Sequence, residues 1–210
     1  MIRILIADDH MIVRRGLIEI LRRGLDDPVC GEAENAEQLL NQVRNQMWDL
    51  VILDITMPGR SGLDVFHDVK AMCPNLPVLF LSMHAEHQYG TRILKAGASG
   101  YLNKDSAPEE LIKAIHKVRS GGRYVSSELA EKLASDLSTS ADRPAHEILS
   151  DREFEVMRLI ASGKTVGRIA EQLHLSIKTI STYRTRALEK LNMSTTAELM
   201  HYALQNHLVD

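Results

Sequence analysis

The sequence is poor in cysteine and lacks long apolar runs, and both absences bear on where the protein works. Cys30 and Cys73 are the only cysteines among 210 residues, and they are not spaced as metal ligands, which favours a chain kept reduced in the cytosol. No eighteen apolar residues follow one another, so no membrane-spanning helix is predicted. The N-terminus, MIRILIADDH, has neither the apolar stretch nor the cleavage site of a signal peptide. We therefore expect a cytoplasmic protein with no membrane partner.

The sequence also lacks two common nucleotide-binding fingerprints and a strong excess of charge of one sign. No GxxxxGK followed by Ser or Thr occurs, and no GxGxxG follows an apolar run, so neither a P-loop nor a dinucleotide site is predicted. The formal net charge is -3, with 44% apolar and 25% charged residues, which is ordinary for a globular protein. Net charge alone therefore predicts no polyanion partner, and only a local excess of bases could indicate one.

The first 122 residues alternate short apolar runs with amphipathic stretches. Runs that are apolar on both faces, each followed by a helical pattern, are typical of a parallel sheet covered on two sides. Five such units predict an open, doubly wound α/β domain with a five-stranded parallel sheet, whose sites form at the carboxyl ends of the strands. The predicted strands are Ile2–Ala7, Val29–Ala33, Leu50–Leu53, Val78–Leu81 and Gly100–Leu102, and the predicted helices are His10–Arg23, Ala36–Asn45, Gly62–Ala71, His87–Ala96 and Ala107–Ser120.

The pattern changes after residue 122. Residues 123–147 are predicted to be a linker with one short helix, in SSELAEKLASDL, followed by the polar stretch STSADRPAHE. Residues 148–210 contain no strand pattern, and their apolar residues predict four short helices. We therefore expect an α/β domain over 1–122, a linker over 123–147 and a small all-α domain over 148–210.

Three acids stand at the ends of two predicted strands. Asp8 and Asp9 follow the first strand, and Asp54 follows the third, directly after the apolar run Leu50–Leu53. These strand ends are neighbours or near neighbours in a doubly wound sheet, so the carboxylates should lie roughly 4–6 Å apart, where each like-charge contact costs about 3–4 kcal/mol. A cation among the acids would relieve this cost. Oxygen ligands in an open site favour Mg²⁺, beside which Asp54 could attack a phosphoryl group.

Two further polar residues end the fourth and fifth strands, at the same predicted edge. Ser82 follows VLFL and supplies a hydroxyl, and Lys104 follows GYLN and supplies a positive charge for phosphate. A single Asp after a strand is more often a turn or capping residue, and Asp8 or Asp9 could simply cap the helix that begins near His10. His10 could be a metal ligand or a base, although an exposed residue at a helix start is the more common case. The combination at four strand ends indicates a phosphoryl-transfer site.

The motifs ADD, LDITMPGRSGLDV, LFLS and GYLNKD together resemble the receiver domain of two-component response regulators, over residues 1–122. The resemblance implies a flavodoxin-like fold in which Asp54 accepts a phosphoryl group from a sensor histidine kinase. It further implies that Ser82 and Lys104 contact the phosphoryl group, and that Tyr101 rotates inward when Ser82 moves. The Mg²⁺ ligands that it implies are Asp8, Asp9, Asp54 and the main-chain carbonyl of Thr56.

The C-terminal segment has the spacing of a helix-turn-helix. Ser150, with Glu153 three residues later, is a capping box that opens its first helix. Arg168–Leu173, a two-residue turn and a helix over Ile177–Asn192 follow. The last of these spans about 24 Å at 1.5 Å per residue, which is enough to lie in a major groove.

That helix carries bases and small polar residues on one face. Four bases, Lys178, Arg184, Arg186 and Lys190, stand against one acid, Glu189. A basic amphipathic helix taken alone is more often a solvated face of a bundle than a DNA reader, and Arg184 falls within the apolar stripe, where we expect it to pack against a neighbouring helix. Small side chains could reach base edges while bases contact phosphates. The predicted DNA-contacting residues are Lys178, Thr179, Ser181, Thr182, Thr185 and Arg186.

The stretches LSDREFEVMRLIASG, IAEQL and SIKTIS resemble the LuxR-type domain, and with the receiver they resemble the NarL/FixJ class of response regulator. The resemblance implies a transcription regulator, not an enzyme, that binds double-stranded DNA and forms a homodimer when phosphorylated. Tyr183 stands where the family commonly has His, and the family's Ser-Asn-Lys-Glu-Ile is here Thr165–Ile169. The operator sequence therefore cannot be carried over from better-known members.

Two other functions stay open at this point. An Mg²⁺-dependent aspartyl-phosphate phosphatase would use the same acids, but such hydrolases usually have a second acid two residues after the nucleophile, where this chain has Thr56. A DNA-binding regulator that works without phosphate would not need the acid cluster, and all of the cluster's positions are filled. Both alternatives are therefore less well supported than a phosphorylation-controlled regulator.

Overall fold

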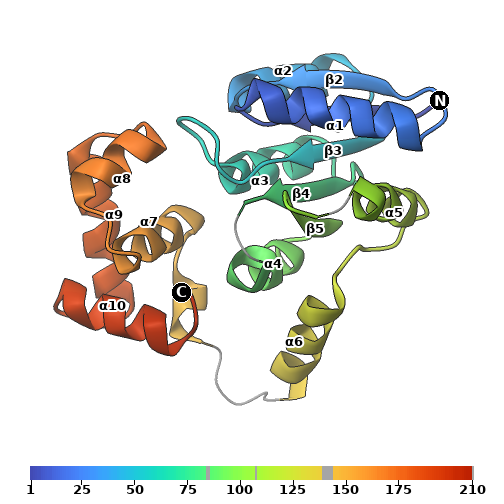
Figure 1. The fold of residues 1–210 in the computed structure, drawn as a ribbon. Helices are drawn as coiled ribbons and strands as arrows, with labels where there is room; N and C mark the ends of the chain where they lie inside the picture. The colour runs from blue at the N-terminus through green and yellow to red at the C-terminus, as the bar shows by residue number, and fades with distance from the viewer. Residues whose placement is uncertain (84–85, 107, 139–143, 210) are drawn as a thin grey trace. The chain divides into compact units, whose positions relative to one another are not determined.

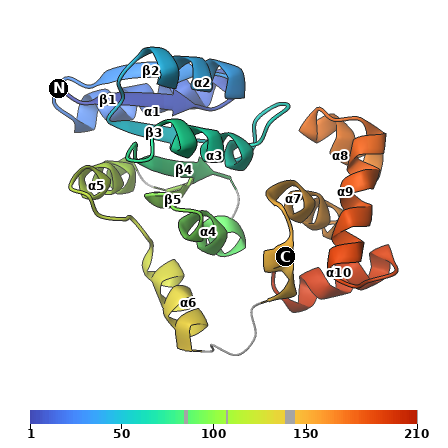
Figure 2. The same ribbon diagram turned by 180° about the vertical axis from the view of Figure 1, so that it is seen from behind.

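The computed structural model describes residues 1–83, 86–106, 108–138 and 144–209. Contacts divide the chain into two compact units, Met1–Leu133 and Ala134–Asp210 (Figures 1 and 2). The division falls within the segment 123–147 that we expect to be a linker, and residues 139–143 of that segment lie outside the described residues. In the described part of the chain, no helix is both long enough and apolar enough to cross a membrane.

The first unit contains a five-stranded parallel sheet, as predicted. Its strand order is β2-β1-β3-β4-β5, which is the flavodoxin-like order of doubly wound sheets. The strands are almost wholly buried in the centre of the sheet, because helices cover both faces. Their bounds are β1 Arg3–Ala7, β2 Val29–Ala33, β3 Leu50–Leu53, β4 Val78–Ser82 and β5 Gly100–Asn103.

The helices of the first unit pack their apolar stripes on the sheet. On one face, Leu17 and Leu21 of α1 and Ile115 of α5 share a core with Ile4 of β1 and Ile52 of β3. On the other face α2 packs beside α3, and the ring of Phe66 in α3 meets that of Phe80 in β4 with centroids 5.3 Å apart. The bounds are α1 Met11–Gly24, α2 Ala36–Asn45, α3 Gly62–Met72, α4 Glu86–Lys95 and α5 Pro108–Arg119. The helix α6 spans Ser127–Ser138, and the division between the two units falls within it.

The register of the central strands brings the predicted acids together. Ala7 of β1 lies opposite Leu53 of β3, and Asp8 and Asp54 are the next residues along each strand. The main-chain N–H of Asp54 donates to the carbonyl of Ala7 at 2.8 Å, and that of Lys104 donates to the carbonyl of Ser82 at 2.8 Å. Strand pairing thus continues one residue past each strand and fixes the backbone at this edge.

The segment after α5 packs on the first unit, where we expected a linker. Tyr124 forms a parallel bridge with Gly100 of β5, and its N–H donates to the carbonyl of Ser99 at 2.8 Å. The Ser126 hydroxyl, which accepts from the N–H of Leu129 at the start of α6, donates to the carboxylate of Glu86 in α4. Leu129 is 2% exposed. The chain therefore adds a short edge bridge and a helix to the α/β unit.

The second unit is all-helical, as predicted. Its apolar core includes Ile169, Ile180 and Leu199, and the predicted capping box at Ser150 and Glu153 opens α7. Its helices are a 3₁₀ turn over Ala145–Ile148, α7 Asp151–Ala161, α8 Val166–Leu173, α9 Ile177–Lys190 and α10 Thr196–Gln205.

The helix-turn-helix spacing is also found in the second unit. His174, in the left-handed conformation (φ 52°), ends α8, and the hydroxyl of Ser176 caps α9 by accepting from the N–H of Thr179. The turn between the two helices is therefore as short as the sequence predicted.

Candidate functional site

Two buried carboxylates and one ammonium meet at the carboxyl edge of the sheet. Asp8 is 2% exposed and Asp54 is 3% exposed. The Nζ of Lys104 lies 2.6 Å from Oδ2 of Asp8 and 2.8 Å from Oδ2 of Asp54. The sequence predicted from strand ends that these residues share one edge of the sheet, and the structure shows that they are in contact although they lie up to 96 positions apart.

Burial and neighbouring charges shift the pKa values of Asp54 and Lys104 in opposite directions. Burial raises the pKa of the Asp54 carboxyl to about 6, against the Lys104 ammonium and the main-chain N–H of Thr56, which both lower it. Burial alone would lower the pKa of Lys104, but the Asp54 and Asp8 carboxylates raise it above its ordinary value. Asp54 is therefore mostly ionised at pH 7, as a carboxylate nucleophile must be.

The loop after β1 holds the remaining acid. The Oδ1 of Asp8 accepts from the N–H of His10 at 2.8 Å, so Asp8 does fill the turn role that we considered, while its other oxygen contacts Lys104. The Nδ1 of His10 lies 2.7 Å from Oδ1 of Asp9, and the His10 side chain is 66% exposed. The structure therefore places an exposed His10 at the margin of the acid cluster. Neither a role as a metal ligand nor a role as a base is decided by this position.

The donor set fits a hard divalent cation. One possible ligand atom from each of Asp8, Asp9, His10 and Asp54 lies within 4.8 Å of all the others. Oδ1 of Asp9 is buried, and its contact with His10 does not have the geometry of a hydrogen bond. A buried carboxylate oxygen that accepts no hydrogen bond from a described residue is costly unless a positive charge lies beside it. Carboxylate oxygens of this kind are the ligands that Mg²⁺ prefers.

The other predicted residues of this edge lie on the expected elements. Ser82 ends β4 and is 1% exposed, and Tyr101 on β5 is buried opposite Phe80 of β4. Thr56 is half-buried in the loop after β3, where its N–H donates to the Asp54 carboxylate.

One residue that the sequence analysis did not single out, Gly62, packs against the main-chain carbonyl of Asp54. A Cβ at Gly62 would lie 1.9 Å from the main-chain oxygen of Asp54, and the N–H of Gly62 donates to the carbonyl of Ile55 at 2.7 Å. Ser61 and Asp64 form a capping box around this position. That pattern was readable in GRSGLD and could have indicated a helix start pressed against the strand end.

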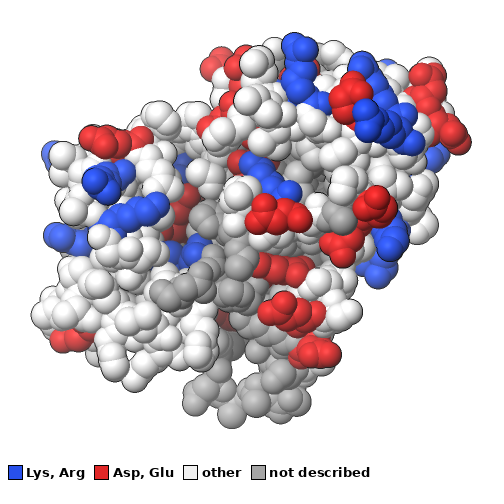
Figure 3. Space-filling model, viewed as in Figure 1, with Lys and Arg blue, Asp and Glu red and all other residues white. Residues whose placement is uncertain are grey.

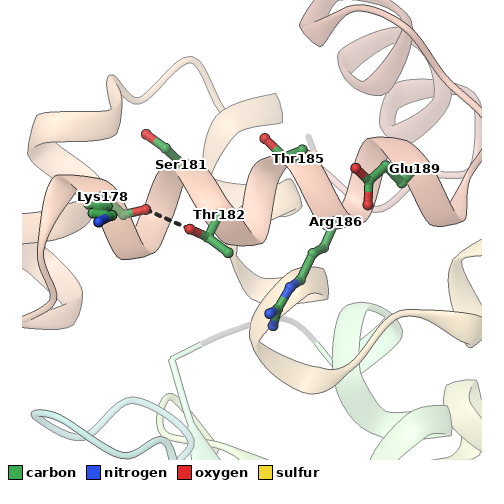
Figure 4. A pocket seen from close by; sticks show the side chains of 6 residues that line it. All are labelled: Lys178, Ser181, Thr182, Thr185, Arg186 and Glu189. Carbon is green, nitrogen blue, oxygen red and sulfur yellow. Dashed lines mark hydrogen bonds between the residues drawn. The ribbon is translucent and has the colours of Figure 1, made fainter.

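In the second unit, α9 presents a polar face with a shallow groove. The groove has a volume of about 380 Å³, and Lys178, Ser181, Thr182, Thr185, Arg186 and Glu189 line it (Figure 4). The Thr182 hydroxyl donates to the carbonyl of Lys178 at 2.9 Å. Figure 3 shows Lys and Arg side chains gathered over the part of the surface where Figure 1 has α8 and α9.

Three further residues of α9 do not line this groove. Thr179 does not line the groove, and its hydroxyl lies 2.7 Å from that of Ser176 at the helix start. Lys190 donates to Oε2 of Glu153 in α7 at 2.6 Å. The Nε of Arg184 is buried, as we expected from its place in the apolar stripe.

Each of the two units contains a segment that matches the model of a known protein family. Residues 4–116 match the family model of the response regulator receiver domain, and residues 147–203 match that of the luxR family of bacterial regulatory proteins. The response regulator UvrY of Escherichia coli strain K12 is 36% identical over 209 residues, which cover 99% of this chain and 96% of UvrY. The chain is a response regulator of the NarL/FixJ class.

Other relatives resemble this response regulator over its full length. The response regulator GacA of Pseudomonas protegens is 36% identical over 211 residues, which cover 100% of this chain and 99% of GacA. A structure of RcsB from Salmonella enterica serovar Typhimurium, bound to promoter rprA with the phosphomimetic BeF₃⁻, has 30% identity, a TM-score of 0.65 and covers 96% of this chain and 98% of RcsB. Receiver domains of this family bind Mg²⁺ at an acidic pocket, and this chain has a cluster of Asp8, Asp9, His10 and Asp54 that could hold a metal ion.

Proposed function

We propose that this response regulator is switched by phosphorylation of Asp54 and then binds double-stranded DNA through α9. The observation that carries the proposal is the meeting of Lys104 with Asp8 and Asp54 at 2.6 and 2.8 Å. A buried, ionised carboxylate that faces both an ammonium and a cluster of oxygen ligands is the arrangement that a phosphoacceptor needs.

The chemistry follows from the positions of the side chains. A carboxylate oxygen of Asp54 attacks the phosphorus of a phosphohistidine on a sensor histidine kinase, the new O–P bond replaces the P–N bond, and the imidazole leaves with the bonding pair. Bound Mg²⁺ would neutralise charge on the phosphoryl oxygens. Asp8, Asp9, Asp54 and the carbonyl of Thr56 would hold the ion.

The switch would follow the charge that is added at Asp54. Lys104 would exchange part of its contact with Asp54 for the phosphoryl oxygens, and the Ser82 hydroxyl would donate to them. Tyr101 would turn inward as Ser82 moves. Such charge-assisted contacts favour one of two receiver arrangements.

On the DNA side, Lys178 and Arg186 would contact phosphates, while Ser181, Thr182 and Thr185 would reach base edges. Thr179 would support this set from the helix start. A homodimer would form on phosphorylation, since paired half-sites need two recognition helices. Because its partner is chromosomal DNA, we expect the protein to act in the cytoplasm. We expect no catalytic turnover of phosphate esters, because Thr56 offers no carboxyl as a general acid.

DNA retention tests the proposal. The purified chain is mixed with random-sequence duplexes, with and without Mg²⁺ and acetyl phosphate, and the retained DNA is measured. We expect binding to tighten with the phosphodonor in the wild type, and we expect Asp54→Ala to remove that gain. Asp105→Ala is the matched control, because this exposed acid lies next to Lys104 and should keep the gain.

Each outcome of this experiment separates the alternatives. Equal binding in every condition would leave a DNA-binding protein without a phosphorylation switch. No retention in any state would contradict the function assigned to α9. In a separate assay, the release of more than one phosphate per chain from a phosphate ester would favour the phosphatase.

A further inference from the structure

A buried arginine lies behind the acid cluster. Arg14, in the first turns of α1, is 6% exposed. Its Nη1 donates to the main-chain carbonyl of Asp8 at 2.8 Å, and its Nε donates to Oε2 of Glu32 on β2 at 3.0 Å. Neither Arg14 nor Glu32 was singled out from the sequence, and neither belongs to the predicted ligand set.

The position of Arg14 is unfavourable for a charged residue. It belongs to the buried face of α1 together with Leu17, Ile18 and Leu21, where a leucine would avoid the cost of removing a guanidinium from water. That cost is large until the guanidinium is paired. An arginine here therefore needs a reason beyond packing, and the reason lies in what its guanidinium contacts.

The contacted carbonyl belongs to the peptide bond that joins Asp8 to Asp9. The main-chain N–H of Asp8 donates to the carbonyl of Ala33 at 3.1 Å. The side-chain carboxylate of Asp8 accepts from the N–H of His10. The hydrogen bond from Arg14 holds the carbonyl of the next peptide, and the hydrogen bond between His10 and Asp8 closes a turn around that same peptide. That peptide determines where the chain turns after Asp8, and so where the Asp9 carboxylate lies.

We propose that Arg14, oriented by Glu32, is a positioning residue for the cation site. This inference rests on the proposed function, because it assumes that Asp8 and Asp9 bind a divalent cation. Arg14 does not bind the ion, since a guanidinium has no lone pair to offer a metal. Its fork holds the Asp8–Asp9 peptide with one N–H and takes its own orientation from Glu32 with another. Outer contacts of this kind orient the ligands of a metal.

Direct titration with Mn²⁺ tests the proposal without using phosphorylation. The full chain is titrated at fixed pH and ionic strength, and free Mn²⁺ is measured by electron paramagnetic resonance. Arg14→Lys keeps the charge but loses the fork, and it should weaken Mn²⁺ binding by about 10- to 100-fold. Arg22→Lys is the matched control on the same helix, because Arg22 is exposed and forms an ion pair with Glu19. It should leave the Kd unchanged.

Glu32 supplies a second test that does not remove a buried side chain. Its side chain is 37% exposed, so the fold should tolerate its replacement. Glu32→Ala removes the acceptor for Nε, whereas Glu32→Gln keeps an acceptor and removes the same charge. We expect Glu32→Ala to weaken Mn²⁺ binding and Glu32→Gln to restore most of the loss. Circular dichroism and thermal unfolding check that each variant is folded at the temperature of the titration.

The outcomes distinguish this inference from the proposed function. If the wild type binds no Mn²⁺, the cation site itself fails. If the wild type binds and Arg14→Lys binds within twofold of it, the positioning role is wrong even if unfolding temperatures fall. Should Glu32→Ala and Glu32→Gln weaken binding equally, Glu32 acts through its charge alone, which also overturns the proposal.

Discussion

Asp54 is held between a strand end and a helix start, and Gly62 makes this close approach possible. The N–H of Asp54 pairs with β1, and its carbonyl lies against Gly62 at the first position of α3. The backbone of Asp54 therefore cannot move toward Gly62 without moving α3. A rigid backbone of this kind positions a carboxylate for in-line attack better than a free loop would.

We predict that Gly62→Ala destabilises the first unit. The new Cβ would lie 1.9 Å from the main-chain oxygen of Asp54, so α3 or the end of β3 must shift. We expect a loss of about 1–3 kcal/mol or more in the free energy of unfolding, as for other overpacked positions. Urea unfolding followed by circular dichroism measures it.

Gly16→Ala is the control for that prediction. Gly16 lies in α1, and a Cβ there would meet nothing within 4 Å. The same substitution should stabilise by about 0.4–1 kcal/mol, because alanine favours helix. If both variants changed stability in the same direction by similar amounts, the close contact at Gly62 would not explain the result.

At the scale of elements, some basic residues of α9 line its groove and one contacts a neighbouring helix. Lys178 and Arg186 line the groove on its polar face, whereas Lys190 contacts Glu153 in α7. Burial works to raise the pKa of Glu153, but the hydrogen bonds from Lys190 and Ser150 outweigh it and lower the pKa. Lys190 thus anchors the helix to α7, whereas Lys178 and Arg186 line the groove.

We predict that Arg186→Ala changes the salt dependence of DNA binding, whereas Lys190→Ala changes the stability of the fold. Arg186→Ala removes a phosphate contact, so the slope of log affinity against log salt on random duplex DNA should become shallower by about one. Lys190→Ala should leave the slope unchanged and lower the free energy of unfolding by about 1 kcal/mol, because the pair is partly exposed. Filter binding at several salt concentrations and urea unfolding measure the two effects. A shallower slope for Lys190→Ala would mean that α9 meets DNA with a different face.

At the scale of the whole molecule, the chain is built as two units with separate cores. The first extends past α5, because Tyr124 bridges to β5 and Leu129 packs beside Gly90 of α4. A Cβ at Gly90 would lie 2.7 Å from a methyl of Leu129, which shows how closely α4 and α6 approach. Any boundary drawn at the end of α5 therefore cuts through packed structure.

We predict that a fragment of residues 1–122 is less stable than a fragment of residues 1–138. The shorter fragment loses the Tyr124 bridge and the buried Leu129 side chain, which should cost about 2–4 kcal/mol. Urea unfolding of both fragments gives the difference. Leu129→Ala in the longer fragment should account for a large share of it, and equal midpoints for the two fragments would show that α6 adds nothing to the first unit.

The sequence by itself determined the elements and their order. Periods of two and 3.6 residues are local properties, so Val29–Ala33, Ala36–Asn45 and Leu50–Leu53 were predicted with the bounds that the structure has. The acids could be placed at one edge for a similar reason. In a parallel sheet every strand ends at the same side, so a residue that follows a strand has its location fixed by topology.

Only the tertiary structure decided which groups touch. Lys104 meets Asp54 across 50 residues and Lys190 meets Glu153 across 37, and no local pattern carries those distances. The capping pattern in GRSGLD indicates a helix start, but it does not say how closely Gly62 approaches Asp54, and the burial of Arg14 runs against the usual place of arginine on the surface. Periodicity fixes which face of an element is buried, whereas the packing of elements against one another fixes which side chains meet there.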